Sequence, residues 1–183
     1  MIRVATLLVS TALALAACAP TVTTPTLGPD GKPLPRVYRI NSADEARIEY
    51  RMLDSVNALR EAAGAAKVSL NSQLNAAAAT HSRDMSMQNR PWHFGSDGSS
   101  PIDRARRVGY SGQLLGENIS ETYETELETL AAWMEDSATR DVIVDSSATD
   151  LGFAWFQEPN GKIWWTLVTG GSSAPVQLAF DAN

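Results

Sequence analysis

Residues 92–110 read "WHFGSDGSSPIDRARRVGY", a loop that runs into a short basic helix. Ser100 and the proline after it predict the start of this helix, because proline is favoured in the first helical turn, and Asp103 then lies near its positive end. Gly109 predicts where the helix stops. The loop contains His93, one of only two histidines in the chain, so it is the first candidate for a functional site. The alternative is a surface residue packed between its two aromatic neighbours.

Two longer helices are predicted before this loop. Ser42 and Glu45 have the spacing of a capping box, and Gly64 is placed to end the helix that follows. Asn71 is a good N-cap for the next helix, which carries His81 on its apolar face. We expect His81 to point inward and to donate a hydrogen bond to a backbone carbonyl. The first helix is supported by apolar residues at helical spacing, namely Ile48, Met52, Leu53, Val56 and Leu59.

The second half of the chain predicts one more helix and then strands. The segment "GENIS" at 116–120 is expected to be extended, and a helix is expected over 123–137. The runs "LGFAWFQ" (151–157) and "KIWWTLV" (162–168) favour strands, and the turn residues "EPNG" between them predict a hairpin. Helices followed by strands indicate an α+β fold. The stripe expected to be buried on the 123–137 helix is Leu127, Leu130, Ala131 and Met134, with Trp133 beside it.

The first residues are typical of an exported protein. A basic start, a short apolar run and small residues predict a signal peptide over 1–17. The tetrapeptide "LAAC" resembles a bacterial lipobox, which implies cleavage before Cys18 and acylation of its thiol. Residues 18–41, rich in proline and threonine, would then be a tether, and Ala19 favours the outer membrane in a cell with two membranes. The alternative is an ordinary exported protein with a stray cysteine.

The charge of the chain excludes one class of partner. The predicted signal peptide contains one arginine and no acid, so 14 basic and 21 acidic residues remain after it. Nucleic acid is held mainly through lysine and arginine on phosphates, so an acidic chain is a poor binder. We therefore predict no nucleic-acid partner.

Five stretches of the chain occur in a characteristic order, namely "VNALREAAG", "LNSQLNAAAATHSRDM", "HFGSDGSSPIDRARRVGY", "GENIS" and "WWTLVTGG". Together they resemble the CAP superfamily, also called the SCP or pathogenesis-related-1-like domain, in its compact bacterial form. The resemblance implies a three-layer α-β-α sandwich with a small antiparallel sheet and a shallow groove. It places the domain at 42–171 and leaves 172–183 as a C-terminal tail.

The resemblance also implies a site. In the family, a histidine in the loop before the third helix faces a glutamate in the "GEN" turn, which corresponds here to His93 and Glu117. A carboxylate beside an imidazole orients it and raises its pKa, and the pair offers one nitrogen and one oxygen ligand to a metal. Asn118 is expected to hold the turn through its amide.

This chain departs from the family pattern at the second histidine. Bacterial members carry it where Thr139 lies, and eukaryotic members carry it where Trp164 lies. Asp136 stands where eukaryotic members have a second glutamate, and is expected to replace it in part. His93, Glu117 and Asp136 would bind zinc weakly compared with sites that have two or three imidazoles. No cofactor is therefore expected beyond a weakly held divalent metal.

The predicted function is that of a lipid-anchored extracytoplasmic binding module of the cell envelope, with a degenerate His/Glu groove and no catalysis. Its partners would be the membrane, through Cys18, and a small hydrophobic ligand, an envelope glycan or a protein. Phe156 or Trp164 is expected to help line the groove. The alternative is a peptidase- or esterase-like hydrolase that uses His93 and Glu117, with a metal or with a nearby serine. A third possibility is a structural spacer.

The remaining prediction concerns Arg104, Arg106 and Arg107, which would form a solvated face or pair with acids of the 123–137 helix.

Overall fold

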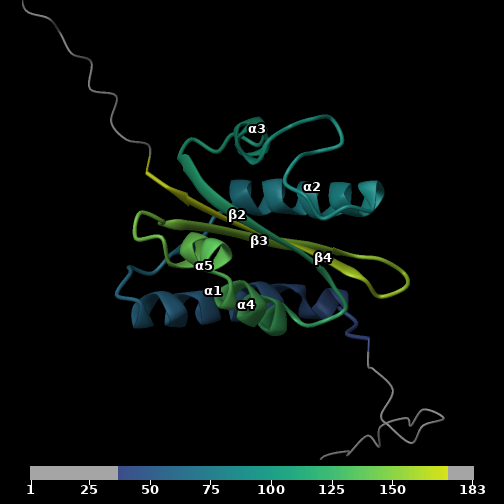
Figure 1. Ribbon diagram of the computed structural model, residues 1–183, viewed down its shortest axis with the longest axis horizontal. Helices are drawn as coiled ribbons and strands as arrows, with labels where there is room; N and C mark the ends of the chain where they lie inside the picture. Colours follow the sequence, from purple (N-terminus) through teal and green to yellow (C-terminus); the bar gives the residue numbers. More distant parts are fainter. Residues whose placement is uncertain (1–36, 173–183) are drawn as a thin grey trace, which may run out of the picture. The chain divides into compact units, whose positions relative to one another are not determined.

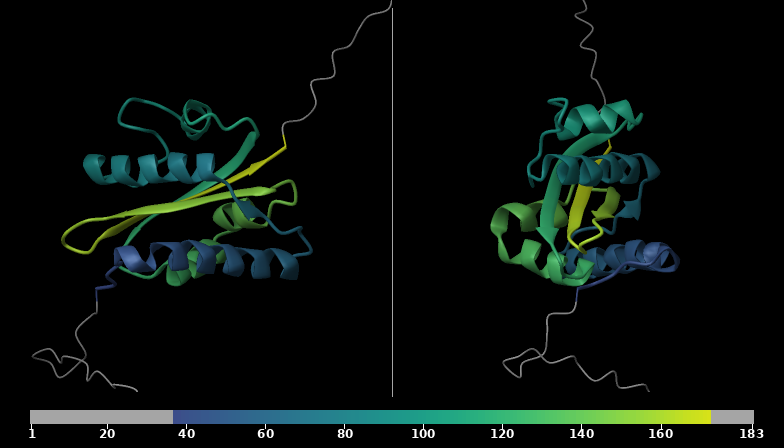
Figure 2. Two further views of the ribbon diagram at one scale, coloured as in Figure 1. Left: turned by 180° about the vertical axis from the view of Figure 1, so that it is seen from behind. Right: turned by 90° about the vertical axis from the view of Figure 1, so that its right-hand side faces the viewer.

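The computed structural model describes residues 37–172 as three layers. A four-stranded sheet lies between α2 and α3 on one face and α1, α4 and α5 on the other (Figures 1 and 2). This arrangement confirms the predicted α+β sandwich. In chain order the elements are a 3₁₀ helix at Ser42–Asp44, α1 (Glu45–Ala62), β1 (Ser69–Leu70), α2 (Ser72–Gln88), α3 (Pro101–Arg107), β2 (Gln113–Thr122), α4 (Glu126–Glu135), α5 (Ser137–Val144), β3 (Asp150–Gln157) and β4 (Ile163–Gly171).

Several predictions fall outside the described residues. The signal peptide, Cys18 and most of the tether lie before residue 37, and the C-terminal tail lies almost entirely after residue 172. These therefore stay predictions. Within residues 37–172, no helix combines the length and the apolar character that a membrane span requires.

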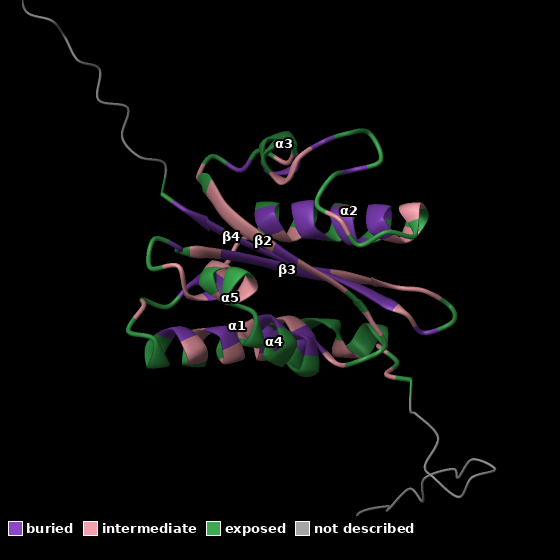
Figure 3. Ribbon diagram, in the orientation of Figure 1, coloured by how far each residue is buried: buried purple, intermediate pink, exposed green. Residues whose placement is uncertain are grey.

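The sheet is mixed and not purely antiparallel as predicted. Its strand order is β1-β3-β4-β2, and β4 pairs antiparallel with both β3 and β2. The short β1 pairs parallel with the start of β3, where Ser69 lies opposite Asp150. This pairing joins parts of the chain that are far apart in sequence, so no local sequence pattern predicts it. The predicted hairpin is confirmed, and every residue of β4 is buried (Figure 3).

The larger half of the core lies between the sheet and the α1, α4 and α5 layer. Phe153 and Trp165 stack there with ring centroids 5.5 Å apart and planes 10° from parallel. Both rings are fully buried, as are Ile48, Met52 and Val56 of the α1 stripe, while Leu53 and Leu59 are partly buried. The opposite face of the sheet packs against α2 through small residues, among them Ala78 and Ala154. Small side chains bring α2 close to the sheet, and this closeness positions the site described below.

The start of the domain differs from the prediction in two ways. The capping box expected from Ser42 and Glu45 does not form, because Ser42–Asp44 is a 3₁₀ turn that precedes α1. The end of the predicted tether also packs on the domain. The backbone nitrogen of Ile40 donates to Gln157 Oε1 at 3.0 Å, and Gln157 Nε2 donates to the Tyr38 carbonyl at 2.7 Å. The domain therefore begins about four residues earlier than predicted.

The helix predicted over 123–137 is shorter than predicted, and a second helix that was not predicted follows it. Thr125 forms a capping box with Glu128, which starts α4 at residue 126. Asp136 then adopts an extended conformation and accepts hydrogen bonds from the first backbone nitrogens of α5. The later start also changes the buried face, so that Leu127 is exposed and Glu126, Thr129, Leu130 and Trp133 are buried.

Substitution of Gly152 tests the close contact of β3 with α2. A Cβ at this position would lie 2.4 Å from the carbonyl carbon and 2.6 Å from the Cβ of Leu74. We expect Gly152→Ala to lower the free energy of unfolding in urea by about 1–3 kcal/mol, the usual cost of overpacking. Gly116→Ala is the comparison, since the three heavy atoms nearest to its Cβ all belong to the side chain of Val142 and none to the backbone. Equal losses in the two variants would contradict the prediction.

Candidate functional site

The structure brings His93 and Glu117 together. Glu117 lies on β2 with its side chain 3% exposed, and His93 lies in the loop between α2 and α3 with its side chain 50% exposed. Nδ1 of His93 is 2.9 Å from Oε1 of Glu117. Because an ionised carboxylate only accepts, Nδ1 carries the hydrogen and donates it. The other ring nitrogen, Nε2, is then the one available to a ligand.

Arg104 occupies the second oxygen of Glu117. Its side chain is 4% exposed and donates to Oε2 of Glu117 at 2.7 Å. The same guanidinium donates to the carbonyl oxygens of His93 and Ser99, at 2.9 and 3.1 Å. The prediction for Arg104 is therefore wrong, since it is neither solvated nor paired with an acid of α4. It connects the carboxylate to the loop that carries the histidine.

His81 lies beneath this pair, on α2. It is fully buried, and its Nε2 is 2.9 Å from the carbonyl oxygen of Trp92, which confirms the predicted bond to a backbone carbonyl. The same nitrogen is 3.7 Å from Oε1 of Glu117. Because a carbonyl only accepts, Nε2 of His81 carries the hydrogen. Nδ1 is buried without a hydrogen-bond partner among the described residues.

The surroundings keep Glu117 ionised and His81 neutral. Burial by itself would raise the pKa of Glu117, but the hydrogen bond from His93 and the charge and hydrogen bond of Arg104 outweigh it and lower that pKa. Burial lowers the pKa of His81, and the attraction of Glu117 only partly opposes it. The centre of the site is therefore a buried carboxylate held between a guanidinium and an imidazole.

Asp84 of α2 fixes the loop of residues 93–99 from the side of the helix. Its carboxylate accepts hydrogen bonds from the backbone nitrogen of Ser96 at 2.7 Å and from the Ser96 hydroxyl at 2.6 Å. Gly95 is needed at the tightest point, because a Cβ there would lie 2.6 Å from Oγ of Ser99. No local pattern in the sequence marks Arg104 or Asp84 for this role. Together they hold the backbone on each side of His93.

The other predicted site residues lie elsewhere. Asn118 points to the opposite face of the sheet and donates to the carbonyl of Thr139 at 2.8 Å, so it ties β2 to α5. Asp136 caps α5, and no contact joins it to His93 or Glu117 among the described residues. Trp164 is fully buried and donates to Glu158 at 2.7 Å, so it does not line an open groove.

The donor set does not fit a metal ion. One oxygen of Glu117 already accepts from His93 and the other from Arg104, and a cation placed on the latter would meet the guanidinium charge. Nε2 of His81 is turned to a carbonyl. Across residues 37–172, three or more His, Cys, Asp or Glu side chains nowhere gather as metal ligands do.

The buried His81 predicts a pH dependence of stability. Its folded pKa lies below its usual value of 6.5, so the unfolded chain takes up a proton at a higher pH than the folded one. The stability it confers is complete above pH 6.5 and is lost as the pH falls through its folded pKa. We expect urea unfolding, followed by tryptophan fluorescence, to show lower stability at about pH 5.5 than at about pH 7.5. His81→Gln, whose amide can still donate to Trp92, should show a smaller difference; an unchanged difference would contradict this assignment.

Comparisons with known proteins agree with this architecture. The model of the CAP family, described as the cysteine-rich secretory protein family, matches residues 53–169. The chain is 28% identical over 116 residues to the uncharacterized protein YkwD of Bacillus subtilis (strain 168), a match that covers 63% of this chain and 44% of YkwD. It therefore spans less than half the length of that relative.

Two solved structures share the fold. An extracellular protein containing an SCP domain from Bacillus anthracis superposes with a TM-score of 0.64 at 19% identity, over 74% of this chain and 45% of that one. An outer surface protein from Borrelia burgdorferi superposes with a TM-score of 0.61 at 13% identity, over 75% of this chain and all of that one. With the family model covering most of the domain, these findings show that the chain belongs to the cysteine-rich secretory protein, or CAP, family.

Proposed function

We propose that this chain is an exported, lipid-anchored CAP-domain protein that binds a ligand of the cell envelope at the surface around His93, without catalysis. One observation carries the binding role, namely that both oxygens of Glu117 are engaged, by His93 and by the buried Arg104. Such a carboxylate orients the imidazole and holds the loop, and neither of its oxygens is free of a hydrogen bond. This arrangement suits recognition by a fixed, preorganised surface.

The surface beside His93 favours a ligand with an apolar or ring-shaped part. Phe94 is 48% exposed, and its ring centroid lies 5.6 Å from that of Trp92. Arg90 covers Trp92, with its guanidinium carbon 3.8 Å from the ring centre. An exposed imidazole beside aromatic rings offers both a polar contact and an apolar platform, which fits a small hydrophobic molecule, an envelope glycan or a protein side chain.

The test of this binding role is mass spectrometry of molecules that co-purify with the detergent-extracted native protein. We expect a ligand that is retained by the unmodified protein and lost from His93→Ala. Lys67→Ala is the control, because Lys67 is exposed and pairs only loosely with Glu61, at 3.5 Å. A ligand retained equally by His93→Ala would overturn the binding role proposed for the surface around His93.

Export and anchoring are supported by the first 18 residues of the sequence. The solved relatives described as extracellular and as an outer surface protein agree with export. The anchor is tested by mass spectrometry of the N-terminal peptide and by separation of membranes from soluble protein. We expect an acylated peptide that begins at Cys18, and release of the protein from membranes in Cys18→Ser. A soluble unmodified protein would refute the anchor and leave the binding role untouched.

A hydrolase is the second candidate, and one observation favours it. Donation from Nδ1 of His93 to Glu117 leaves Nε2 able to accept a proton, as in the general base of a catalytic triad. The test is hydrolysis of p-nitrophenyl acetate together with zinc analysis of the purified domain. Hydrolysis or one zinc per chain, either one abolished in His93→Ala, would favour the enzyme. The proposed binding module predicts neither.

A further inference from the structure

The charges of the domain are separated between its layers. The segment 72–112, which contains α2, α3 and the loop between them, has five arginines and three acids. The rest of the described chain has seven basic and sixteen acidic residues. The α2–α3 layer is therefore positive on a domain that is otherwise strongly negative.

Three of the five arginines of this layer have side chains without a carboxylate or carbonyl partner. Within residues 37–172, the side chains of Arg83, Arg90 and Arg106 form no ion pair and no hydrogen bond, whereas Arg104 and Arg107 pair with Glu117 and Asp97. Arg83 lies over the ring of Phe156, 4.6 Å from its centre, and Arg90 covers Trp92. Every other basic side chain of the described part donates to a carboxylate or to a backbone carbonyl. The pairs are Arg39–Pro159, Arg47–Asp44, Arg51–Glu126, Arg60–Ala66, Lys67–Glu61, Arg104–Glu117, Arg107–Asp97, Arg140–Met134 and Lys162–Glu121. With carboxylates in excess, unpaired guanidinium groups on one layer are free to bind an external anion.

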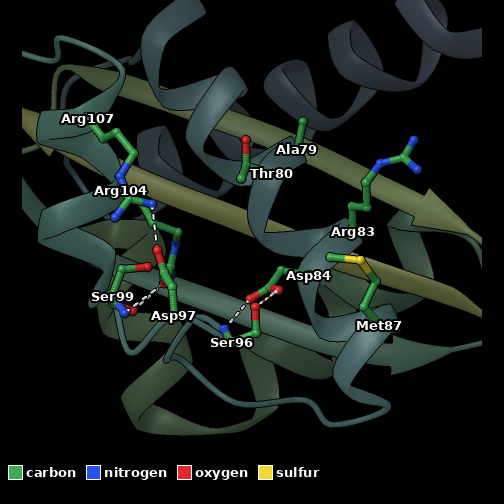
Figure 4. A pocket seen from close by; sticks show the side chains of 10 residues that line it. All are labelled: Ala79, Thr80, Arg83, Asp84, Met87, Ser96, Asp97, Ser99, Arg104 and Arg107. Atoms are coloured by element: carbon green, nitrogen blue, oxygen red, sulfur yellow. Dashed lines mark hydrogen bonds and ion pairs between the residues drawn. The ribbon is translucent and has the colours of Figure 1, made fainter.

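A pocket of about 410 Å³ lies on this layer, between α2, the loop and α3 (Figure 4). Arg83 and Arg107 lie at its opposite ends in that view, with Thr80 between them. Buried Asp84 and Arg104 form its polar base. Neither His93 nor Glu117 lines the pocket, so it is separate from the surface around His93 described above. Its remaining lining residues are Ala79, Met87, Ser96, Asp97 and Ser99.

The lining has the chemistry of a site for a charged, hydroxylated ring. A guanidinium binds a carboxylate through two parallel hydrogen bonds. Asp97 is held as an ionised acceptor, since hydrogen bonds from Ser99 and then from Arg107 lower its pKa. Carboxylates and hydroxyls exchange hydrogen bonds with sugar hydroxyls, while Met87, 71% exposed, offers an apolar surface to the face of a ring. The volume lies within the range of about 300–1,000 Å³ usual for ligand pockets.

We propose that this pocket binds an acidic glycan, with Arg83 holding the carboxylate of one sugar unit, Arg107 adding positive charge at the opposite end of the pocket, and the hydroxyl and Asp side chains holding sugar hydroxyls. The site is independent of the role proposed for His93. Arg104 is the one side chain that contributes to both places, through its contacts with Ser99 and Glu117.

The experiment is calorimetric titration of residues 37–183 with tetragalacturonic acid, a uronic-acid tetrasaccharide. The matched neutral probe is its methyl ester, which keeps the hydroxyls and removes the charges. We expect binding of the acid only, weakened about tenfold by Arg83→Gln and by Arg107→Gln, and weakened by added salt. Both side chains are exposed, so an unchanged thermal midpoint will show that the variants fold.

Two control variants separate this site from others. Arg47→Gln removes a surface arginine of α1, and His93→Ala alters the neighbouring surface; neither should change the affinity. The proposal is overturned if the methyl ester binds equally, if Arg83→Gln binds as well as the unmodified protein, or if inorganic phosphate competes at the same concentration as the tetrasaccharide. Loss of binding only in His93→Ala would also overturn it, and would place the acid at the surface around His93 instead.

Discussion

Replacement of Arg60 by methionine is expected to lower the free energy of unfolding by about 4 kcal/mol, because it leaves several buried acceptors without donors. Arg60 is fully buried at the end of α1 without a carboxylate partner. Its guanidinium donates to four backbone carbonyls at 2.8–3.0 Å, those of Ala66, Ile143, Asp145 and Ala148. Burial lowers the pKa of Arg60 without discharging it near neutral pH. One side chain therefore joins α1 to the end of α5 and the start of β3.

The measurement is urea unfolding followed by tryptophan fluorescence. Arg47→Met is the matched control on the same helix, since Arg47 is 68% exposed and pairs only with Asp44. We expect the control to change stability by less than about 0.5 kcal/mol. The stability loss in Arg60→Lys should lie between the losses in Arg60→Met and Arg47→Met. The reason is that a lysine ammonium has fewer hydrogen-bond donors than a guanidinium and places them differently. A loss in Arg60→Met no larger than in the control would show that water satisfies these carbonyls.

Removal of Arg104 is the second change with a large expected effect. Arg104→Met leaves Glu117 as a buried carboxylate without its guanidinium, and such a break costs about 3–5 kcal/mol. Glu117→Leu leaves the buried guanidinium without its carboxylate and should cost a similar amount. The double variant should lose clearly less than the sum of the two, since residues in one network couple by about 0.5–3 kcal/mol.

The same variants should also differ in the pH at which acid unfolds them. Without Arg104 the pKa of Glu117 is expected to rise, because burial then acts against fewer stabilising contacts. The stability that Glu117 confers is present above its unfolded pKa and is lost as the pH falls through its folded pKa. Acid unfolding of Arg104→Met should therefore begin at a higher pH than that of the unmodified protein. Strict additivity in the double variant, with no shift in acid, would mean that the ion pair contributes nothing.

Local chemistry made part of this structure predictable. Asn71 caps α2 through its side chain, and Ser100 with Asp103 forms a capping box at α3, both as their residue types suggest. The hairpin followed in the same way from alternating aromatic residues and a turn. The pairing of His93 with Glu117 came from the resemblance to a family and not from spacing, since nothing local relates a loop to a strand 24 residues later.

The remaining features depend on contacts that the sequence does not express. Arg104 lies on a helix of seven residues, and fewer than two full turns cannot define an inward face by periodicity. Ile102, the apolar residue that periodicity would place inside, is 47% exposed. The break between α4 and α5 depends on Asp136, whose side chain fits an N-cap as well as a helix interior near its end. In each case two conformations are locally acceptable, and tertiary contacts determine which of them forms.

The position of β4 has a kinetic consequence. It is the last strand described and also an inner one, paired on one side with β3 and on the other with β2. As a chain is made from its N-terminus, the early helices have only the short β1–β3 pair to pack against until this final strand appears. Assembly must therefore wait for long-range pairings, which form slowly and late. The domain should stay loose and extensible during synthesis and then condense in a single step once residue 171 is free to enter the middle of the sheet.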